Sequence, residues 1–246
     1  MRFQDAAPDA RAVVYAGIQA DPLVAEAADL LAGASTAERL LARAVMNGES
    51  SQPERWRTMF PTLFGTAVDD AAEARSEAIL AVSLRVAERG DQVRSQVRGA
   101  VVEAVTEALL RRRSSAVRRE RRILFDGVRA EIHPYDVTLE ADERPEAYDC
   151  KWGARGINAD VLHQLDDARS HAADDDARLA IALVVFDAAR SCAVRLAGTS
   201  APLGGLRLAT IESLDELTVG PPTTDAVALA EDARDADDPF GGWSSE

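Results

Sequence analysis

The longest unbroken apolar run in the chain is the eight-residue segment 179–186, LAIALVVF. If this segment is extended, apolar side chains leave both of its faces, so it predicts a strand in the middle of a sheet with a layer of structure on each side. Eight residues are too few to cross a bilayer, for which a helix needs about 20. The run therefore indicates a layered fold with no membrane-spanning segment.

Strand and helix patterns alternate around this run. Five further segments have the pattern of strands: residues 121–125, 128–132, 135–140, 147–152 and 206–211. The first two flank Asp126-Gly127, a dipeptide typical of hairpin turns, and the next two alternate polar and apolar side chains. Helical spacing follows at 158–173 and 187–196. We therefore expect an α/β fold with a mixed central sheet flanked by helices.

The first hundred residues have helical spacing instead. A capping box at Ser35-Thr36-Ala37-Glu38 begins one helix. An apolar residue at every fourth position marks another: Val93, Val97, Val101, Val105 and Leu109. We expect an all-helical region at 1–98 that serves regulation, dimerisation or partner binding. An α/β domain at 99–220 and an acidic, disordered tail at 221–246 should follow it.

Charge is unevenly distributed along the chain. The net charge of −14, from 28 basic and 42 acidic residues, argues against a protein that coats nucleic acid without specificity. Residues 111–122 carry seven arginines and one glutamate, a local charge of +6, whereas residues 225–246 carry seven acids and one arginine, a local charge of −6. The arginine run is therefore suited to phosphate, and the tail repels it.

Two cysteines, Cys150 and Cys192, are too few for a disulfide framework and lack the spacing of a zinc site. The N-terminal sequence MRFQDAAPDARAVV lacks the basic patch and apolar stretch of a signal peptide. We expect a soluble, cytoplasmic protein without a structural metal.

Lysine occurs once, at Lys151, whereas the other 27 basic residues are arginine. In a chain so biased towards arginine, a retained lysine indicates a need for a compact amine that guanidinium does not replace. Asp149 lies two positions earlier and shares a strand face with Lys151, because side chains on a strand have a period of two. If the strand that carries Asp136 pairs with this one, the three side chains converge.

Such a cluster is suited to phosphodiester hydrolysis. Two carboxylates on neighbouring strands, with the carbonyl of Cys150 between the key side chains, supply the oxygen ligands that Mg²⁺ takes in proteins. A metal-bound water is acidified and attacks a phosphodiester in line. The ammonium of Lys151 then holds that water or offsets charge on the phosphate.

The segment Pro134-Tyr135-Asp136-Val137, followed by Asp149-Cys150-Lys151, resembles the active-site motif of the PD-(D/E)xK nuclease superfamily, which has the restriction-endonuclease-like fold. The helix with Gln164 and the later strands also follow that family's order, so the resemblance covers residues 100–220. It departs from the pattern in the tyrosine between Pro134 and Asp136.

The resemblance implies an endonuclease that depends on Mg²⁺, for which Mn²⁺ can substitute, and that cleaves DNA or, more rarely, RNA. Position by position, it makes Asp136 and Asp149 metal ligands, Lys151 the catalytic lysine and Gln164 a further site residue. Many members have a glutamate on the helix before the sheet, and Glu103 and Glu107 are the candidates here.

Several arginines are candidates for contact with the nucleic-acid backbone: Arg118, Arg119, Arg121, Arg122 and Arg155. Phosphate contacts of this kind weaken steeply with salt. The alternative for the arginine run is that it is simply a solvated surface at a helix end. His133 lies near the proposed site and is a candidate substrate contact, whereas His163 and His171 have no third ligand for zinc. Nucleotide-binding glycine motifs are absent, so any motor would be another chain.

Three functions remain open from the sequence. The first is a metal-dependent DNA endonuclease, by analogy the effector of a restriction or phage-defence system, which would favour a homodimer if it cuts both strands. The second is a nuclease-fold protein that binds nucleic acid or a partner without cleaving. The third is an acidic protein that mimics DNA and occupies a DNA-binding partner.

Overall fold

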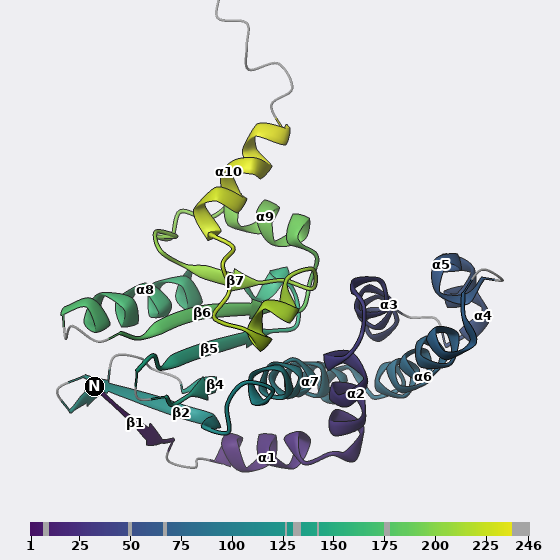
Figure 1. Ribbon diagram of the computed structural model, residues 1–246, viewed down its shortest axis with the longest axis horizontal. Helices are drawn as coiled ribbons and strands as arrows, with labels where there is room; N and C mark the ends of the chain where they lie inside the picture. Colours follow the sequence, from purple (N-terminus) through teal and green to yellow (C-terminus); the bar gives the residue numbers. More distant parts are fainter. Residues whose placement is uncertain are drawn as a thin grey trace, which may run out of the picture. The chain divides into compact units, whose positions relative to one another are not determined.

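The computed structural model describes residues 1–6, 10–48, 51–65, 68–125, 127–129, 134–141, 143–174 and 178–237. The chain forms two compact units (Figure 1). The helical unit is Ala6–Val117, and the sheet unit combines Met1–Asp5 with Arg118–Glu246.

Helices make up the described part of the helical unit: α1 (Ala10–Gln19), α2 (Pro22–Ala32), α3 (Thr36–Asn47), α4 (Pro53–Met59), α5 (Pro61–Phe64), α6 (Asp70–Ala87) and α7 (Asp91–Arg111). The predicted capping box begins α3: Ser35 accepts from the backbone N–H of Glu38, and Glu38 accepts from the N–H of Ser35. Four of the five stripe residues on α7 are fully buried, and Val93 is 38% exposed. Local patterning therefore predicted this unit well.

The sheet unit contains a mixed sheet in the order β1-β2-β4-β5-β6-β7, with β3 paired to β2. Its strands are β1 (Arg2–Asp5), β2 (Val117–Phe125), β3 (Val128–Arg129), β4 (Tyr135–Leu139), β5 (Glu146–Lys151), β6 (Ala180–Val185) and β7 (Arg207–Ala209). Strands β1, β2 and β3 pair antiparallel, as do β4 and β5, whereas β5, β6 and β7 are parallel. The predicted α/β class with a mixed sheet is confirmed.

The apolar run forms β6, which has a neighbour on each side as predicted; it lies next to the short edge strand β7, and both neighbours are parallel to it. One face of β6 packs in a hydrophobic core with α8 (Ala159–Asp174) and α9 (Ala189–Ala197). This core contains Leu183 from β6, Leu165 from α8 and Leu196 from α9. Asn158 caps α8 by accepting from the N–H of Val161 at 3.0 Å. Two short 3₁₀ helices, η1 (Ala154–Gly156) and η2 (Leu214–Thr218), complete the unit with α10 (Ala226–Asp237).

Several predicted boundaries differ from the structure. The N-terminal residues form β1, which pairs with β2 at Arg2↔Leu124, instead of a helix. The helical unit extends to Val117 and not to residue 98, because the apolar stripe of α7 continues to its last turn. Residues 226–237 form α10, which packs on α9 with Ala226 and Ala230 buried, although the sequence predicts disorder from 221. Residues 238–246 lie outside the described part.

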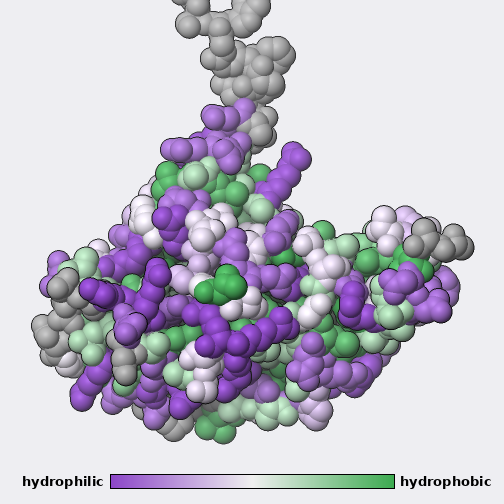
Figure 2. Space-filling view, in the orientation of Figure 1, coloured by the Kyte–Doolittle hydropathy of each residue, from purple (hydrophilic) through white to green (hydrophobic). Residues whose placement is uncertain are grey.

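Few large apolar side chains are exposed in the described residues. Val13 and Val14 on α1 are adjacent, and others are separate, as at Met59, Val194 and Val219. Hydrophilic side chains predominate on the face of the sheet unit seen in Figure 2. Among the described helices, none combines the length and the apolar character needed to cross a membrane.

Candidate functional site

The site lies where β4 separates from β5. The antiparallel register pairs Val137 with Tyr148. Continued by one residue, it sets Asp136 opposite Asp149, and residues opposite each other share a face of the sheet. The Oδ2 atom of Asp136 accepts a hydrogen bond of 2.5 Å from the backbone N–H of Cys150. A side-chain carboxylate thus binds the backbone between Asp149 and Lys151.

Asp149 and Lys151 form a close ion pair on this face. The Nζ atom of Lys151 donates to Oδ1 of Asp149 at 2.6 Å and lies 2.5 Å from Oδ2. The side chains are 13% exposed for Asp149 and 24% for Lys151. Oδ2 is buried and lies outside hydrogen-bond geometry, despite its short distance to the ammonium. A further ligand of Oδ2 would therefore share this oxygen with the Lys151 ammonium or displace the ammonium.

Electrostatics keep Lys151 protonated. Burial lowers its pKa, but the carboxylates of Asp149 and Asp136 and the hydrogen bond to Asp149 raise it, and the net effect is a pKa above the ordinary value. The ammonium is therefore charged at neutral pH. In this state it attracts anions and cannot act as a base.

The cluster contains oxygen donors of the kind that hard divalent cations bind. Asp136 and Asp149 supply carboxylate oxygens, and the carbonyl of Cys150 points to the same side of β5 as its N–H, because one residue of an antiparallel ladder directs both groups to one neighbour. Two carboxylates and a carbonyl leave positions for water and phosphate, as Mg²⁺ requires. The thiol of Cys150 is buried and is not part of this set. No group of three or more His, Cys, Asp or Glu side chains in the described residues is arranged to hold a metal.

The two candidate helix glutamates are engaged within the helical unit. Glu103 accepts hydrogen bonds from Tyr15 at 2.5 Å and from Gln19 at 2.8 Å, and it is 4% exposed. Glu107 forms an ion pair with Arg111 at 2.6 Å, one helical turn away. These contacts give both glutamates a structural role in α1 and α7.

Gln164 is half-buried on α8, next to the buried Leu165. It forms no hydrogen bond with any described residue, so the structure does not link it to the acids. His163 is exposed on the same helix, and His171 stacks on Phe125 with ring centroids 6.0 Å apart. His133 lies outside the described residues.

The predicted arginine contacts separate into two kinds. Arg121 forms ion pairs with Glu140 at 2.5 Å and with Asp5, and its side chain is only 14% exposed, so it ties β1 and β4 to β2. Arg118, Arg119 and Arg122 also have partners within the chain. They lie on β2, which begins at Val117, and not at a helix end.

Arg155, by contrast, is exposed on η1 and forms no hydrogen bond or ion pair with the described part of the chain. It is therefore the one predicted arginine that both follows the Asp149–Lys151 strand directly and keeps its donors for a ligand.

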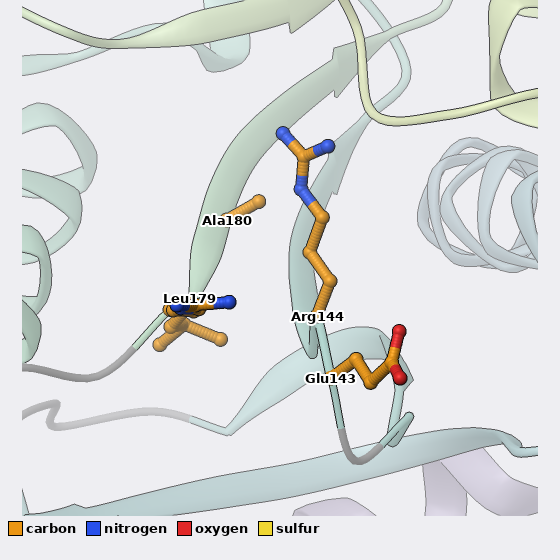
Figure 3. A pocket seen from close by; sticks show the side chains of 5 residues that line it. Glu143, Arg144, Leu179 and Ala180 are labelled. Carbon is orange, nitrogen blue, oxygen red and sulfur yellow. The ribbon is translucent and has the colours of Figure 1, made fainter.

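A cavity of about 540 Å³ lies elsewhere in the sheet unit (Figure 3). Its lining residues are Glu143, Arg144, Arg178, Leu179 and Ala180. These residues precede or begin β5 and β6, whereas Asp149 and Lys151 lie towards the end of β5. The cavity is therefore distinct from the acid–lysine cluster.

Two residues near the cluster were missed from the sequence. Asp187 is 7% exposed, and its carboxylate accepts from the N–H groups of Ala154 and Ala188, both at 2.9 Å. Gly156 lies directly against the stem of Lys151. An acid immediately after a fully apolar strand is the signal that could have identified Asp187.

Comparison of the chain with models of known protein families, with curated proteins and with solved structures found no match. The site is therefore interpreted from its geometry alone.

Proposed function

We propose that this protein is a metal-dependent nuclease with a restriction-endonuclease-like core in its sheet unit. The observation that carries the proposal is the hydrogen bond from Cys150 N–H to Asp136, which joins that carboxylate to the Asp149–Lys151 pair. The carboxylate of Asp149 and the charged lysine would supply the other groups that phosphodiester hydrolysis needs.

Each residue has a separate task in this proposal. Asp136 and Asp149 hold the cation, which when bound acidifies water and offsets negative charge on the phosphate. Lys151 gives up part of its contact with Asp149 and directs its ammonium towards the attacking water or the phosphate oxygens. Arg155 contacts a neighbouring backbone phosphate.

DNA is the proposed substrate, with RNA as the alternative to be tested. Cleavage of both strands of a duplex by one site per chain would favour a homodimer. The proposal is tested by incubating plasmid, single-stranded DNA and RNA with the protein in Mg²⁺, in Mn²⁺ and in EDTA.

We expect cleavage with either metal, none in EDTA, and a loss on the order of 100- to 1,000-fold in Lys151→Ala, the size found when one charge-stabilising group is removed. Asp149→Ala should lose activity to a similar extent, whereas Asp160→Ala, an exposed acid on α8, should remain active. Cleavage that survives in folded Lys151→Ala and Asp149→Ala would contradict the proposal.

A second function is favoured by one observation. Both oxygens of Asp149 lie within 2.6 Å of the Lys151 ammonium, so the pair is closed on itself. A protein that binds nucleic acid without cleaving would retain such a pair. Binding that survives both alanine substitutions, with no cleavage by the wild type, would favour this function.

A further inference from the structure

The stem of Lys151 is enclosed by the turn that follows it. A Cβ atom added at Gly156 would lie 2.9 Å from both Cβ and Cδ of Lys151 and 3.0 Å from its Cγ. Real Cβ atoms do not approach other heavy atoms so closely, and the Cβ of Lys151 is fixed to the strand. Only glycine therefore fits at this position without displacing the lysine.

The turn that contains Gly156 is held at both ends. Asp187 accepts from the N–H of Ala154 at 2.9 Å, and the Nε atom of Arg195 donates to the carbonyl of Ile157 at 2.7 Å. Within the turn, the N–H of Gly156 donates to the carbonyl of Gly153 at 2.8 Å. The turn thus has a fixed position relative to β6 and α9.

The strand end at Lys151 is held by the same region. The N–H of Phe186 donates to the carbonyl of Lys151 at 2.8 Å. Trp152 stacks on Phe186 with ring centroids 5.1 Å apart and an angle of 20° between the rings. Asp187 directly follows Phe186, so one corner of the sheet supports both the lysine backbone and the turn against its stem.

We infer that Gly156, Asp187 and Arg195 are positioning residues that fix the Lys151 ammonium beside Asp149 and Asp136. A lysine side chain in solution samples many rotamers. The backbone at Gly156 excludes the rotamers that would turn the stem of Lys151 towards η1. The expected effect on the rate of cleavage rests on the proposed function, whereas the expected effect on the position of the Lys151 side chain does not.

The chain's single lysine makes this inference directly measurable. Protein labelled with [ε-¹³C]lysine gives one lysine signal in an NMR spectrum, which reports the environment of Lys151. We expect Gly156→Ala to shift this signal, because the added methyl group would displace the lysine stem. If the wild type cleaves DNA, kcat should fall on the order of 100-fold, as a displacement of about 1 Å would cause, with KM little changed.

A matched control is Gly204→Ala, because no atom lies within 4 Å of a Cβ added at that glycine. It should leave the lysine signal and kcat unchanged. Asp187→Asn and Arg195→Met each remove one anchor of the turn and should shift the signal in the same direction by a smaller amount. Arg195 is exposed on α9, so Arg195→Met tests the inference even if Gly156→Ala fails to fold.

An unchanged lysine signal in the folded variants would overturn the inference. A shifted signal in Gly156→Ala, together with a wild type that cleaves no nucleic acid, would support the positioning role and overturn the proposed function. The two claims therefore fail separately.

Discussion

Lys151 is the residue on which most of the chemistry depends. Its side chain is three-quarters buried yet faces two carboxylates, and their attraction outweighs the effect of burial on its pKa. Arginine would present a planar, wider group to the same two acids, whereas lysine presents a compact ammonium. In a chain with 27 arginines, the one lysine thus lies where a compact ammonium contacts a carboxylate.

The raised pKa predicts a specific alkaline behaviour. The stabilisation from this ammonium is complete below the ordinary lysine pKa of about 10.4 and is lost as the pH rises through the higher folded value. The free energy of unfolding of the wild type should therefore approach that of Lys151→Met across this alkaline window. Urea unfolding of both proteins at several pH values measures this. A gap that stays constant with pH would contradict the prediction.

Among the elements, α3 depends on one buried acid. Glu38 is 1% exposed, accepts from Ser35 in the capping box and pairs with Arg75 at 2.8 Å. Burial raises its pKa, but the hydrogen bonds and the charge of Arg75 together lower it by more, so the net pKa lies below the ordinary value. This one carboxylate connects the start of α3 to α6.

We predict that Glu38→Gln lowers the free energy of unfolding by about 1–3 kcal/mol at neutral pH, because buried partners lose a charged acceptor. The depressed pKa means that this stabilisation is present above the ordinary glutamate pKa of about 4.3 and is lost as the pH falls through the folded value. Urea unfolding followed by helical circular dichroism checks both effects. Glu88→Gln, at an exposed position, is the control, and equal losses in the two variants would contradict the prediction.

At the scale of the whole molecule, the negative net charge of the protein disfavours binding of the proposed substrate, DNA. A net charge of −14 repels DNA, so binding has to come from local contacts at short range. Most of the predicted arginine contacts have partners inside the chain, and Arg155 is the exception among them. We therefore expect few phosphate contacts and a shallow dependence of binding on salt.

Arg155→Ala should weaken DNA binding and reduce the slope of log K against log salt by about 0.9, the value for one lost phosphate contact on a B-form duplex. Fluorescence anisotropy in EDTA measures binding without cleavage. Arg178→Ala removes an equally exposed arginine beside the cavity at the start of β6, and it should leave the slope unchanged. An unaltered slope in Arg155→Ala would remove this residue from the nucleic-acid interface.

Sequence patterns were sufficient wherever the determining interaction is local. The apolar run predicted β6, because a segment with no polar face must be covered on both sides. The alternation at 147–152 predicted that Asp149 and Lys151 share a face, because the period of a strand is a property of its own backbone. The capping box of α3 was likewise predictable from the sequence, since Ser35 and Glu38 lie within one helical turn.

Contacts between distant segments had to come from the tertiary structure. The hydrogen bond from Cys150 to Asp136 depends on the register of β4 and β5, and Asp187 reaches Ala154 across 33 positions of sequence. Strand β1 pairs with the edge of β2, and Arg121 forms ion pairs with Asp5 on β1 and with Glu140 directly after β4. The sequence thus determined which side chains could act together, whereas strand pairing decided which of them meet, because backbone register is fixed by the packing of the whole sheet.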